Sequence, residues 1–261
     1  MEYNLLDSEF AYMFGFIQTD GSFRETYKNK EGISSYELKI EVAEKDINLL
    51  EILHNRCPAI SNISSRIRNT NFKDNYASVS LTINDRNLAK VLLKLGLPLG
   101  KKSKKIFVPN FPLSEIDYWR GIIDGDGSLG FTNGKPYICL CTINDNIADN
   151  FKSFIYKISR SVSKTKKNSR DGAYNIKIVG QRAKEIVEKI YYPGCISLNR
   201  KYIIAKNIIN FQNIKSNIHF SDDDDDYILS HSLDESIKLL NRSKRSIQYR
   251  ISFLKNKLID S

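Results

Sequence analysis

The sequence predicts an α+β protein made of two similar units in tandem, followed by a small helical module. Three observations support this prediction. A segment that ends in Asp-Gly-Ser, followed by one apolar residue, occurs twice, in 14–23 and in 120–129. After each copy, apolar residues alternate with polar ones, which is typical of strands with one face in water. From about Gln212 the composition changes, and apolar residues recur at helical spacing instead.

The repeated segment is the first element of each unit. An apolar, helix-compatible stretch runs directly into an aspartate that glycine follows, which predicts that a helix ends there and a strand begins. Gly15 and Gly121 lie about one helical turn or slightly more before these aspartates and would let two helices approach closely. Asp20 and Asp126 would then lie at one place.

An offset of 106 residues, from Asp20 to Asp126, also relates much of the sequence after the first segment to that after the second. Each unit is predicted to have the order αββαββα, with one face of its antiparallel sheet under the helices. Beyond the strand directly after each segment, the predicted strands are 36–42, 63–72 and 77–83, then 137–143, 162–167 and 174–179. The predicted helices are 47–53 and 86–95, then 147–155 and 182–190, and Asp46 and Asp145 are the expected N-caps. The open faces of the two sheets would form a basic, saddle-shaped concavity.

The predicted domains are a first unit at 1–105, a second at 106–211 and a C-terminal module at 212–261. In the module, Ser232 to Glu235 matches a capping box, and Ser243 can cap a following helix. This order predicts a helix-turn-helix with a basic second helix. The acidic run Asp222–Asp226 fits either a helix N-terminus or a solvated linker.

The charge favours a polyanionic partner. The chain has 40 Lys and Arg against 30 Asp and Glu, a net charge of +10, which fits nucleic acid or an anionic membrane surface. We expect no membrane-spanning segment and no secretory signal, hence an intracellular protein in a bacterial or phage-infected cytoplasm or an organelle matrix. The chain has four scattered cysteines, and none of its three histidines lies near the Cys139 and Cys141 pair, so we expect buried thiols and no zinc site.

Two carboxylates that converge repel each other unless a divalent cation lies between them. Oxygen ligands alone suit Mg²⁺ or Mn²⁺, and with a phosphodiester present such a site can support in-line hydrolysis. A single Asp-Gly would more often be a structural turn between a helix and a strand. Two copies in equivalent positions of a basic, sheet-rich chain favour the catalytic interpretation.

The two segments resemble the paired signatures of the LAGLIDADG homing endonucleases, in the single-chain form with two motifs. The resemblance covers about Glu9 to Asn210. It implies that Asp20 and Asp126 bind the catalytic metals. It also implies one basic residue per active site, after the last helix of each half, and we assign this role to Lys102 and Lys201.

The first copy departs from the family pattern at Gln18, where the second copy has Asp124. That position usually supports packing or the backbone, so the inferred chemistry does not depend on it. Trp119 and Arg120 replace small or aliphatic residues at the start of the second signature, which leaves the packing of that helix open.

The resemblance implies a monomeric endonuclease that makes double-strand breaks at a long asymmetric DNA site, encoded in an intron or intein-like mobile element. The same fold is similar to maturases that bind their own intron RNA, and to transcription regulators without nuclease activity. These alternatives stay open, since both aspartates are compatible with an added splicing role. A membrane-surface protein is disfavoured because no basic amphipathic helix with a bulky aromatic face is present.

A β-ribbon can enter the major groove, where side chains at alternate positions meet the base edges. Alternation assigns a set of residues to the open faces of the two sheets, and charge adds four from the C-terminal module. These candidate DNA-binding residues are Arg24, Thr26, Lys28, Glu37, Lys39, Glu41, Arg66, Arg68, Ser78, Ser80, Thr82, Thr132, Thr142, Ser163, Thr165, Lys167, Asn175, Lys177, Lys244, Arg245, Gln248 and Arg250.

Two apolar residues, Ile138 and Leu140, fall on the same nominal DNA face of the second sheet. Either they contact thymine methyl groups, or the predicted register of this strand is wrong by one residue. A solvated sheet face without any ligand is the plain alternative for the whole set.

Overall fold

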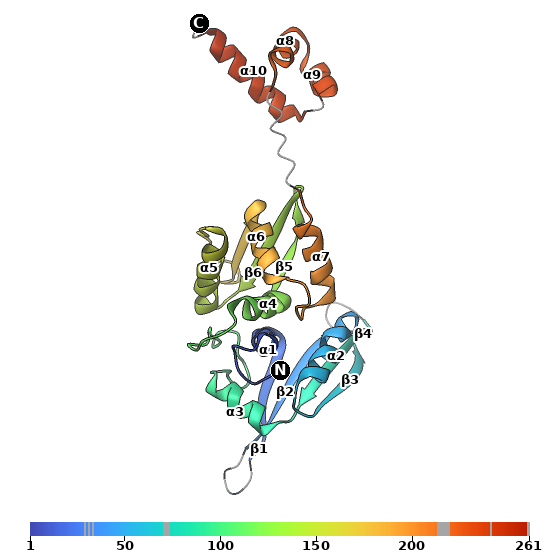
Figure 1. Cartoon of the computed structure of the whole chain (residues 1–261), viewed down its shortest axis with the longest axis vertical. Helices are drawn as coiled ribbons and strands as arrows, with labels where there is room; N and C mark the ends of the chain where they lie inside the picture. Colours follow the sequence, from blue (N-terminus) through green and yellow to red (C-terminus); the bar gives the residue numbers. More distant parts are fainter. Residues whose placement is uncertain are drawn as a thin grey trace. The chain divides into compact units, whose positions relative to one another are not determined.

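The computed structural model describes residues 1–28, 30, 32, 34–69, 74–212, 220–240 and 242–259. The chain divides into two compact units, Met1–Gln212 and Asn213–Ser261. Both are drawn in Figure 1. The two predicted halves, 1–105 and 106–211, share one hydrophobic core within Met1–Gln212.

The first half has the predicted order of elements. They are α1 (Ser8–Asp20), β1 (Gly21–Lys28), β2 (Ser34–Ala43), the 3₁₀ turn η1 (Glu44–Asp46), α2 (Ile47–Arg56), β3 (Ser61–Arg68), β4 (Tyr76–Ile83) and α3 (Arg86–Lys94). The strands form an antiparallel sheet in the order β1-β2-β4-β3. Positions 70–72 of the predicted strand 63–72 lie outside the described residues.

The second half has one strand fewer than predicted. Its elements are α4 (Glu115–Asp126), β5 (Gly127–Thr132), β6 (Lys135–Thr142), α5 (Asp145–Ser159), β7 (Tyr174–Val179), α6 (Gln181–Ile190) and α7 (Asn199–Ile209), with sheet order β5-β6-β7. The predicted strand 162–167 is wrong, since these residues form a loop. Neither set of alternating side chains in 163–167 is apolar, and Val162 is exposed, so no core contact holds the segment in a sheet.

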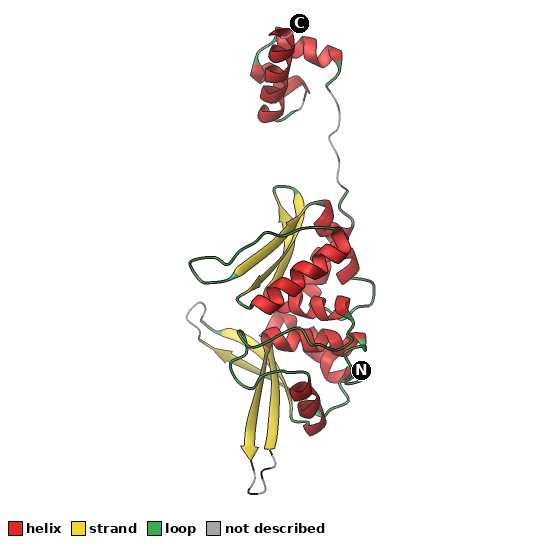
Figure 2. Ribbon diagram, turned by 90° about the vertical axis from the view of Figure 1, so that its left-hand side faces the viewer, coloured by secondary structure: helices red, strands yellow, loops and turns green. Residues whose placement is uncertain are grey.

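The α+β fold class and the antiparallel sheets are confirmed. Figure 2 shows the strands of Met1–Gln212 on one side and the helices on the other. Each sheet is therefore covered on one face, while its second face is open, as a saddle requires.

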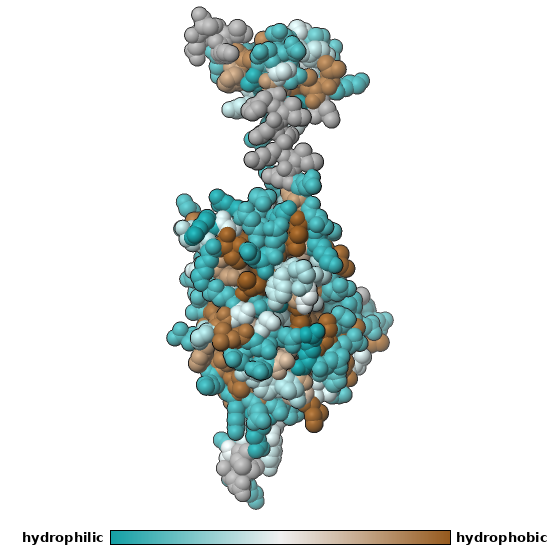
Figure 3. All heavy atoms as spheres, viewed as in Figure 1, coloured by the Kyte–Doolittle hydropathy of each residue, from teal (hydrophilic) through white to brown (hydrophobic). Residues whose placement is uncertain are grey.

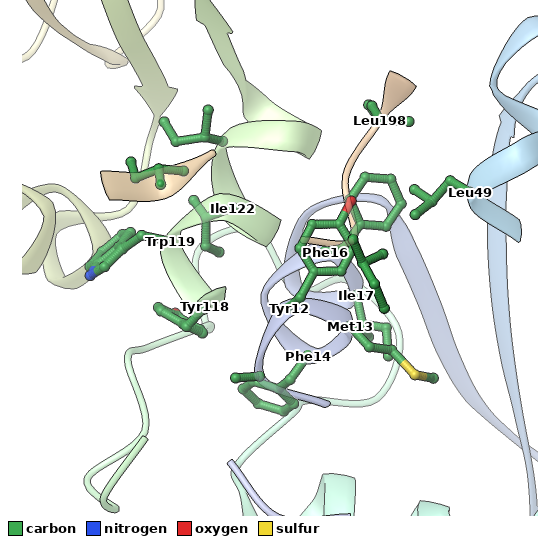
Figure 4. Close-up of a cluster of buried hydrophobic side chains, with 14 of the residues drawn as sticks. Tyr12, Met13, Phe14, Phe16, Ile17, Leu49, Tyr118, Trp119, Ile122 and Leu198 are labelled. Carbon is green, nitrogen blue, oxygen red and sulfur yellow. The ribbon is translucent and has the colours of Figure 1, made fainter. Parts of the chain in front are cut away.

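The pair α1 and α4 lies at the centre of the core (Figure 4). A Cβ at Gly15 would lie 2.3 Å from the carbonyl oxygen of Tyr118, and one at Gly121 would lie 2.2 Å from that of Tyr12. Only glycine permits this backbone approach, so the prediction for both glycines is confirmed. The close crossing is what brings the two helix ends, and their aspartates, together.

The two unusual residues of the second signature have defined partners. Trp119 packs against Phe151 and Phe154 of α5. Arg120 is 1% exposed and donates hydrogen bonds to the carbonyl oxygens of Ile190 and Ile196, besides its ion pair with Asp117. The helix therefore packs with two large side chains at these positions.

Of the two N-cap predictions, the one for Asp145 is wrong, and the one for Asp46 is right in position only. Asn144, not Asp145, caps α5, because its side chain accepts a hydrogen bond from the backbone N–H of Ile147 at 3.0 Å. Asp46 does occupy the N-cap position of α2, but its side chain makes no capping bond.

The unit Asn213–Ser261 contains α8 (Asp222–Ser230), α9 (Leu233–Leu240) and α10 (Lys244–Ile259). The acidic run forms the first turn of α8, where Ser221 and Asp224 make a capping box. The predicted capping box of Ser232 and Glu235 is present at the start of α9. Ile228, Ile247 and Leu254 form a small core of this unit's own.

Hydrophilic side chains predominate on the face of Met1–Gln212 that is visible in Figure 3. None of the helices that the structure describes is long and apolar enough to span a bilayer.

Candidate active site at the ends of α1 and α4

The two aspartates are the last residues of their helices. The backbone N–H of Gly21 bonds to Ile17 O at the end of α1, and that of Gly127 bonds to Ile123 O at the end of α4. Each chain then continues directly into a strand. A Cβ built on Gly125 would lie 3.1 Å from Oδ2 of Asp20, so the two helix ends are in contact.

Asp20 and Asp126 are both exposed to solvent, although protein atoms lie around much of each carboxylate. Burial, and next the charge of Asp126, raise the pKa of Asp20 to about 6. Burial also raises the pKa of Asp126, while Lys102 and Lys201 oppose the rise. Raised pKa values in two adjacent acids indicate a site that would gain from a bound cation.

The donor set fits a divalent cation with oxygen ligands. Asp20 and Asp126 offer carboxylate oxygens, and no third His, Cys, Asp or Glu joins them in a metal-sized cluster within the described ranges. Mg²⁺ usually keeps several waters and takes one or two carboxylates plus phosphate oxygens from a substrate. Two carboxylates at an accessible position therefore suit Mg²⁺ or Mn²⁺.

The two predicted lysines lie beside the carboxylates, and their amines bond to backbone carbonyls of the helix ends. Lys102 Nζ donates to Gln18 O at 2.9 Å and to Thr19 O. Lys201 Nζ donates to the carbonyl oxygens of Ile123, Asp124 and Gly127 at 2.6, 2.7 and 2.8 Å. Burial lowers the pKa of Lys102, and it lowers that of Lys201 to about 8. Both cations thus satisfy carbonyls that a helix end leaves without partners.

The position two residues before each aspartate is structural, as predicted. Gln18 accepts a hydrogen bond from Tyr118 Oη at 2.6 Å and donates one to Phe107 O at 2.9 Å. Asp124 accepts three, from Tyr12 Oη, Tyr191 Oη and the backbone N–H of Leu198, each at 2.7 Å. The tyrosine of each helix thus reaches the polar residue of the other helix.

Three arginines on the open face of the first sheet are paired with glutamates of β2. Arg24 bonds to Glu37, while Arg66 and Arg68 both contact Glu41. Lys39 and Thr82 lie opposite each other on the same face. These pairs present guanidinium and carboxylate groups in fixed positions.

Four other candidates of the first sheet are placed differently from the prediction. Ser78 and Ser80 are 1% and 5% exposed, since they pair with Arg66 and Glu41, whose longer side chains share their face. A bulge between Glu25 and Tyr27 shifts the register of β1, so that Tyr27, rather than Thr26 or Lys28, pairs with Ser35 of the open face.

The predicted register of β6 is wrong by one residue. Ile138 and Leu140 are fully buried and face the helices. Thr142 lies on the same face of β6 and is 8% exposed. Tyr137, Cys139 and Cys141 occupy the open face instead. Thr142 therefore does not lie on the open face. The expectation of buried thiols is wrong for three of the four cysteines, since Cys141 is exposed and Cys139 and Cys195 are partly exposed.

The remaining candidates of the second half fall into two groups. Asn175 and Lys177 pair with Cys141 and Cys139, so they lie on the open face, as does Thr132 of β5. Ser163, Thr165 and Lys167 lie in the loop that replaces the predicted strand, where Lys167 forms an ion pair with Asp145.

In α10, Lys244, Arg245 and Gln248 are exposed. Arg250 is bound within its own unit, because its guanidinium donates to both carboxylate oxygens of Asp225 and lies over the rings of Phe220 and Phe253. Its guanidinium therefore has partners within its own unit, and its contact with DNA stays a prediction.

Two residues near the site were missed by the sequence analysis. Arg200 donates to both carboxylate oxygens of Asp46, at 3.1 and 3.2 Å. Together with Asp20 and Gly125 they line a cavity of about 770 Å³. The position of Arg200, directly before Lys201, was the available signal in the sequence.

The fold of Met1–Gln212 is the fold of the LAGLIDADG homing endonucleases, as the comparison with solved structures shows. The chain is similar to the meganuclease I-SmaMI bound to uncleavable DNA, at 14% identity and a TM-score of 0.53, over 79% of this chain and 90% of that one. It is also similar to the I-SmaMI LAGLIDADG homing endonuclease bound to cleaved DNA, at 13% identity and a TM-score of 0.51, over 76% and 87%.

No family model matches the sequence. Over 187 residues, 65% of this chain, it is 27% identical to the tRNA-splicing ligase RtcB of Pyrococcus furiosus. The match covers 19% of that protein, so the chain spans about a fifth of the length of this curated relative.

Proposed function

We propose that this chain is a site-specific DNA endonuclease that requires a divalent cation and cuts both strands of a long asymmetric target. The observation that carries the proposal is the contact between the ends of α1 and α4, which places Asp20 and Asp126 together. The likeness to two DNA-bound structures of a homing endonuclease supports the substrate class.

In this proposal Asp20 and Asp126 hold the cation, Mg²⁺ or Mn²⁺. When bound, the cation would supply charge neutralisation at the scissile phosphate and lower the pKa of water. The chain's own contribution is to fix the two carboxylates on rigid helices and to place two lysines beside them. Lys201, with a pKa of about 8, is mostly protonated at neutral pH, so it adds positive charge next to the DNA backbone.

The open faces of the two sheets would read the two parts of the target. The first face carries arginines held by glutamates, and paired guanidinium groups suit guanine edges in the major groove. The second face carries Tyr137, Cys139 and Lys177 instead. Because the two faces differ, the target should be asymmetric, and one chain would suffice to bind it.

Three further points belong to the same proposal. The chain would come from a mobile element such as an intron. The C-terminal unit would add DNA contacts through Lys244, Arg245 and Gln248 of a helix-turn-helix. The ligase activity of RtcB does not transfer, since the match covers 19% of that protein.

The test incubates the purified full chain with a randomised duplex library and Mg²⁺, then sequences the cut ends. We expect cutting at one long asymmetric site that EDTA abolishes. Asp20→Asn and Asp126→Asn should each reduce the rate by about 10³-fold or more. Asp149→Asn, an exposed acid on α5, is the matched control and should cut normally.

Absence of any metal-dependent cut by the wild-type chain would refute the proposal. Tight binding to an intron RNA without DNA cleavage would instead identify the chain as a maturase.

A further inference from the structure

The open face of the second sheet has a different chemical character from that of the first. Both faces lie on the side of the strands in Figure 2. The first face carries three arginines, Arg24, Arg66 and Arg68, and each contacts a glutamate of β2. The three strands of the second sheet are described in full, and their open-face positions include neither an arginine nor a carboxylate. The charged residues on this second face are Lys135 and Lys177, both exposed.

Tyr137 lies in the central strand of the second sheet, with a partner on each side. It pairs with Gly130 of β5 and with Val179 of β7. A Cβ built on Gly130 would lie 3.2 Å from Cε1 of the tyrosine ring and 3.5 Å from its hydroxyl oxygen. The ring therefore lies against the backbone of β5, where a side chain at position 130 would crowd it.

Three side chains form an apolar surface on this face. Val179 is 42% exposed, and Cys139, two residues after Tyr137 on the same face, is partly exposed. Paired and diagonal positions on one face of a sheet are close enough to interact. Lys177 Nζ lies 4.3 Å from the centroid of the Tyr137 ring, within the range of a cation–π contact. We call Tyr137, Cys139 and Val179 the Tyr137 patch, and the ammonium of Lys177 lies beside it.

The Tyr137 patch fits one kind of base pair in the major groove. Thymine presents a methyl group there, whereas the other three bases present only hydrogen-bond donors and acceptors. The patch has no guanidinium to bond to guanine and no carboxylate to accept from cytosine. Burial of a methyl group against Tyr137 and Val179 is favourable, so the patch suits A·T pairs.

The surroundings of the patch favour duplex DNA as its partner. β5 begins at Gly127, directly after Asp126, so the sheet that carries the patch starts at the candidate active site. Lys135 and Lys177 are positive, and no carboxylate at the open-face positions of these strands opposes them. Such a face attracts a phosphate backbone, which would bring the base edges of the major groove to the patch.

We propose that the second sheet reads A·T pairs, and that the Tyr137 patch contacts thymine methyl groups in the major groove. The arginines of the first sheet contact guanines in the other arm of the target. The two arms therefore differ in base composition, with one rich in A·T pairs and the other richer in G·C pairs. This inference rests on the proposed endonuclease function and adds which base pairs each sheet recognises.

Small chemical changes in the DNA test the inference without any change to the protein. The probe is the duplex that the full wild-type chain selects and cuts, and its binding is measured in EDTA. Uracil in place of a single thymine removes the methyl group and leaves base pairing intact. A deazaguanine that lacks the N7 acceptor, in place of a single guanine, removes an atom that an arginine would use.

We expect uracil to weaken binding by about 3- to 5-fold at each contacted thymine, because the apolar burial of one methyl group is lost. These thymines should lie in one arm of the target. The deazaguanine should weaken binding by about 10-fold at contacted guanines, and these should lie in the other arm.

Variants of the protein assign each arm to a sheet. Tyr137→Ser should abolish the effect of uracil in the A·T-rich arm, because the methyl group then has no ring to contact. Val179→Ser should reduce the same effect, and it replaces Tyr137→Ser if that variant unfolds at a lower temperature than wild type. Arg66→Gln should abolish the effect of the deazaguanine at a guanine of the other arm.

The matched control is Tyr156→Ser on α5. Tyr156 is an exposed tyrosine whose ring also lies beside a cation, the guanidinium of Arg160, but it is on a helix and not on the open face. This variant should keep the effects of both uracil and the deazaguanine.

Three results would overturn the inference: uracil without effect at every thymine, equal effects of uracil in both arms, or a G·C-rich arm altered by Tyr137→Ser. Each of them requires a selected duplex, so each leaves the proposed function intact. If the wild-type chain selects and cuts no duplex, the proposed function fails, and this inference fails with it.

Discussion

At the end of α1, the buried polar residue that precedes Asp20 is the neutral Gln18, while at the end of α4 the equivalent residue is the carboxylate Asp124. Gln18 donates one hydrogen bond and accepts one. Asp124 only accepts, from two tyrosines and a backbone N–H. Each residue is complementary to its own surroundings, which makes the two sites equivalent in position but not interchangeable in chemistry.

The two halves share some features of the duplicated site and differ in others. The glycines at the helix crossing and the terminal aspartates occur in both halves. The supporting groups differ, and so do the two sheets, of four and three strands. The shared features set the position of the carboxylates, and the different ones adapt each half to its own surroundings.

The largest effect on stability is expected where the halves are most alike, at the helix crossing. Gly15→Ala would place a methyl group 2.3 Å from Tyr118 O, so one of the two backbones must move. We expect a loss of about 3 kcal/mol or more in the free energy of unfolding, measured by urea denaturation. Gly130→Ala, whose Cβ would lie 3.2 Å from the Tyr137 ring, is the control with a smaller effect. Equal stability of both variants would contradict the close crossing.

The second largest effect on stability is expected when the amide of Gln18 becomes a carboxylate or the carboxylate of Asp124 becomes an amide. Gln18→Glu would direct a carboxylate oxygen at Phe107 O, and Asp124→Asn would direct an N–H at one of three donors. Each should cost about 1–3 kcal/mol, because a buried group loses its partner. Urea denaturation of the two single variants measures this cost. A neutral result for Asp124→Asn would show that this half tolerates either residue.

The two lysines differ in burial and in the number of carbonyls that they satisfy. Lys201 is 4% exposed and bonds to three, whereas Lys102 is half-buried and bonds to two. We expect Lys201→Met to lower the free energy of unfolding by about 1 kcal/mol more than Lys102→Met does. The thermal midpoint of Lys201→Met should therefore be the lower of the two. The opposite order would contradict the assignment of these bonds. Both variants should also cut the selected DNA more slowly.

The smallest expected effect is the pH dependence of stability that Asp20 contributes. Its pKa is raised from 3.8 to about 6 in the folded chain, so the folded form favours the protonated acid. This contribution to stability is fully present below about pH 3.8 and is lost as pH rises through about 6. In EDTA, Asp20→Asn should therefore gain stability relative to wild type between pH 4 and 7.

The gain should be about 1 kcal/mol, because the solvent-accessible carboxylate is screened. Denaturation at each pH in this range checks it, with Asp149→Asn, at an exposed acid outside the site, as the control. A difference that does not change with pH would contradict the raised pKa of Asp20.

The sequence was sufficient for the order of elements in the first half, the two glycines and the two aspartates. These depend on local patterns, such as an apolar helix that runs into Asp-Gly, and on their repetition. The register of β6 was not predictable by alternation alone, because Cys139 and Cys141 are apolar enough to pass as core residues. The structure places Ile138 and Leu140 in the core instead.

Other errors arose from contacts between segments that lie far apart in the sequence. Ser78 and Ser80 do face the open side, but neighbouring strands cover them with longer side chains. The sequence does not show that Arg250 pairs with Asp225, 25 residues earlier. Asp46 occupies its predicted N-cap position, but its side chain pairs with Arg200 of the other half and does not cap α2. Spacing along the chain carries no information on such pairs.

The most direct test of the central claim is the position of a bound cation. A crystal of the chain with its selected DNA and Mn²⁺, measured for anomalous scattering, would locate the metal. We predict a peak within coordination distance of carboxylate oxygens of Asp20 and Asp126, about 2.0–2.2 Å. A complex without a peak there, or with Mn²⁺ bound elsewhere while the DNA is cut, would contradict the account.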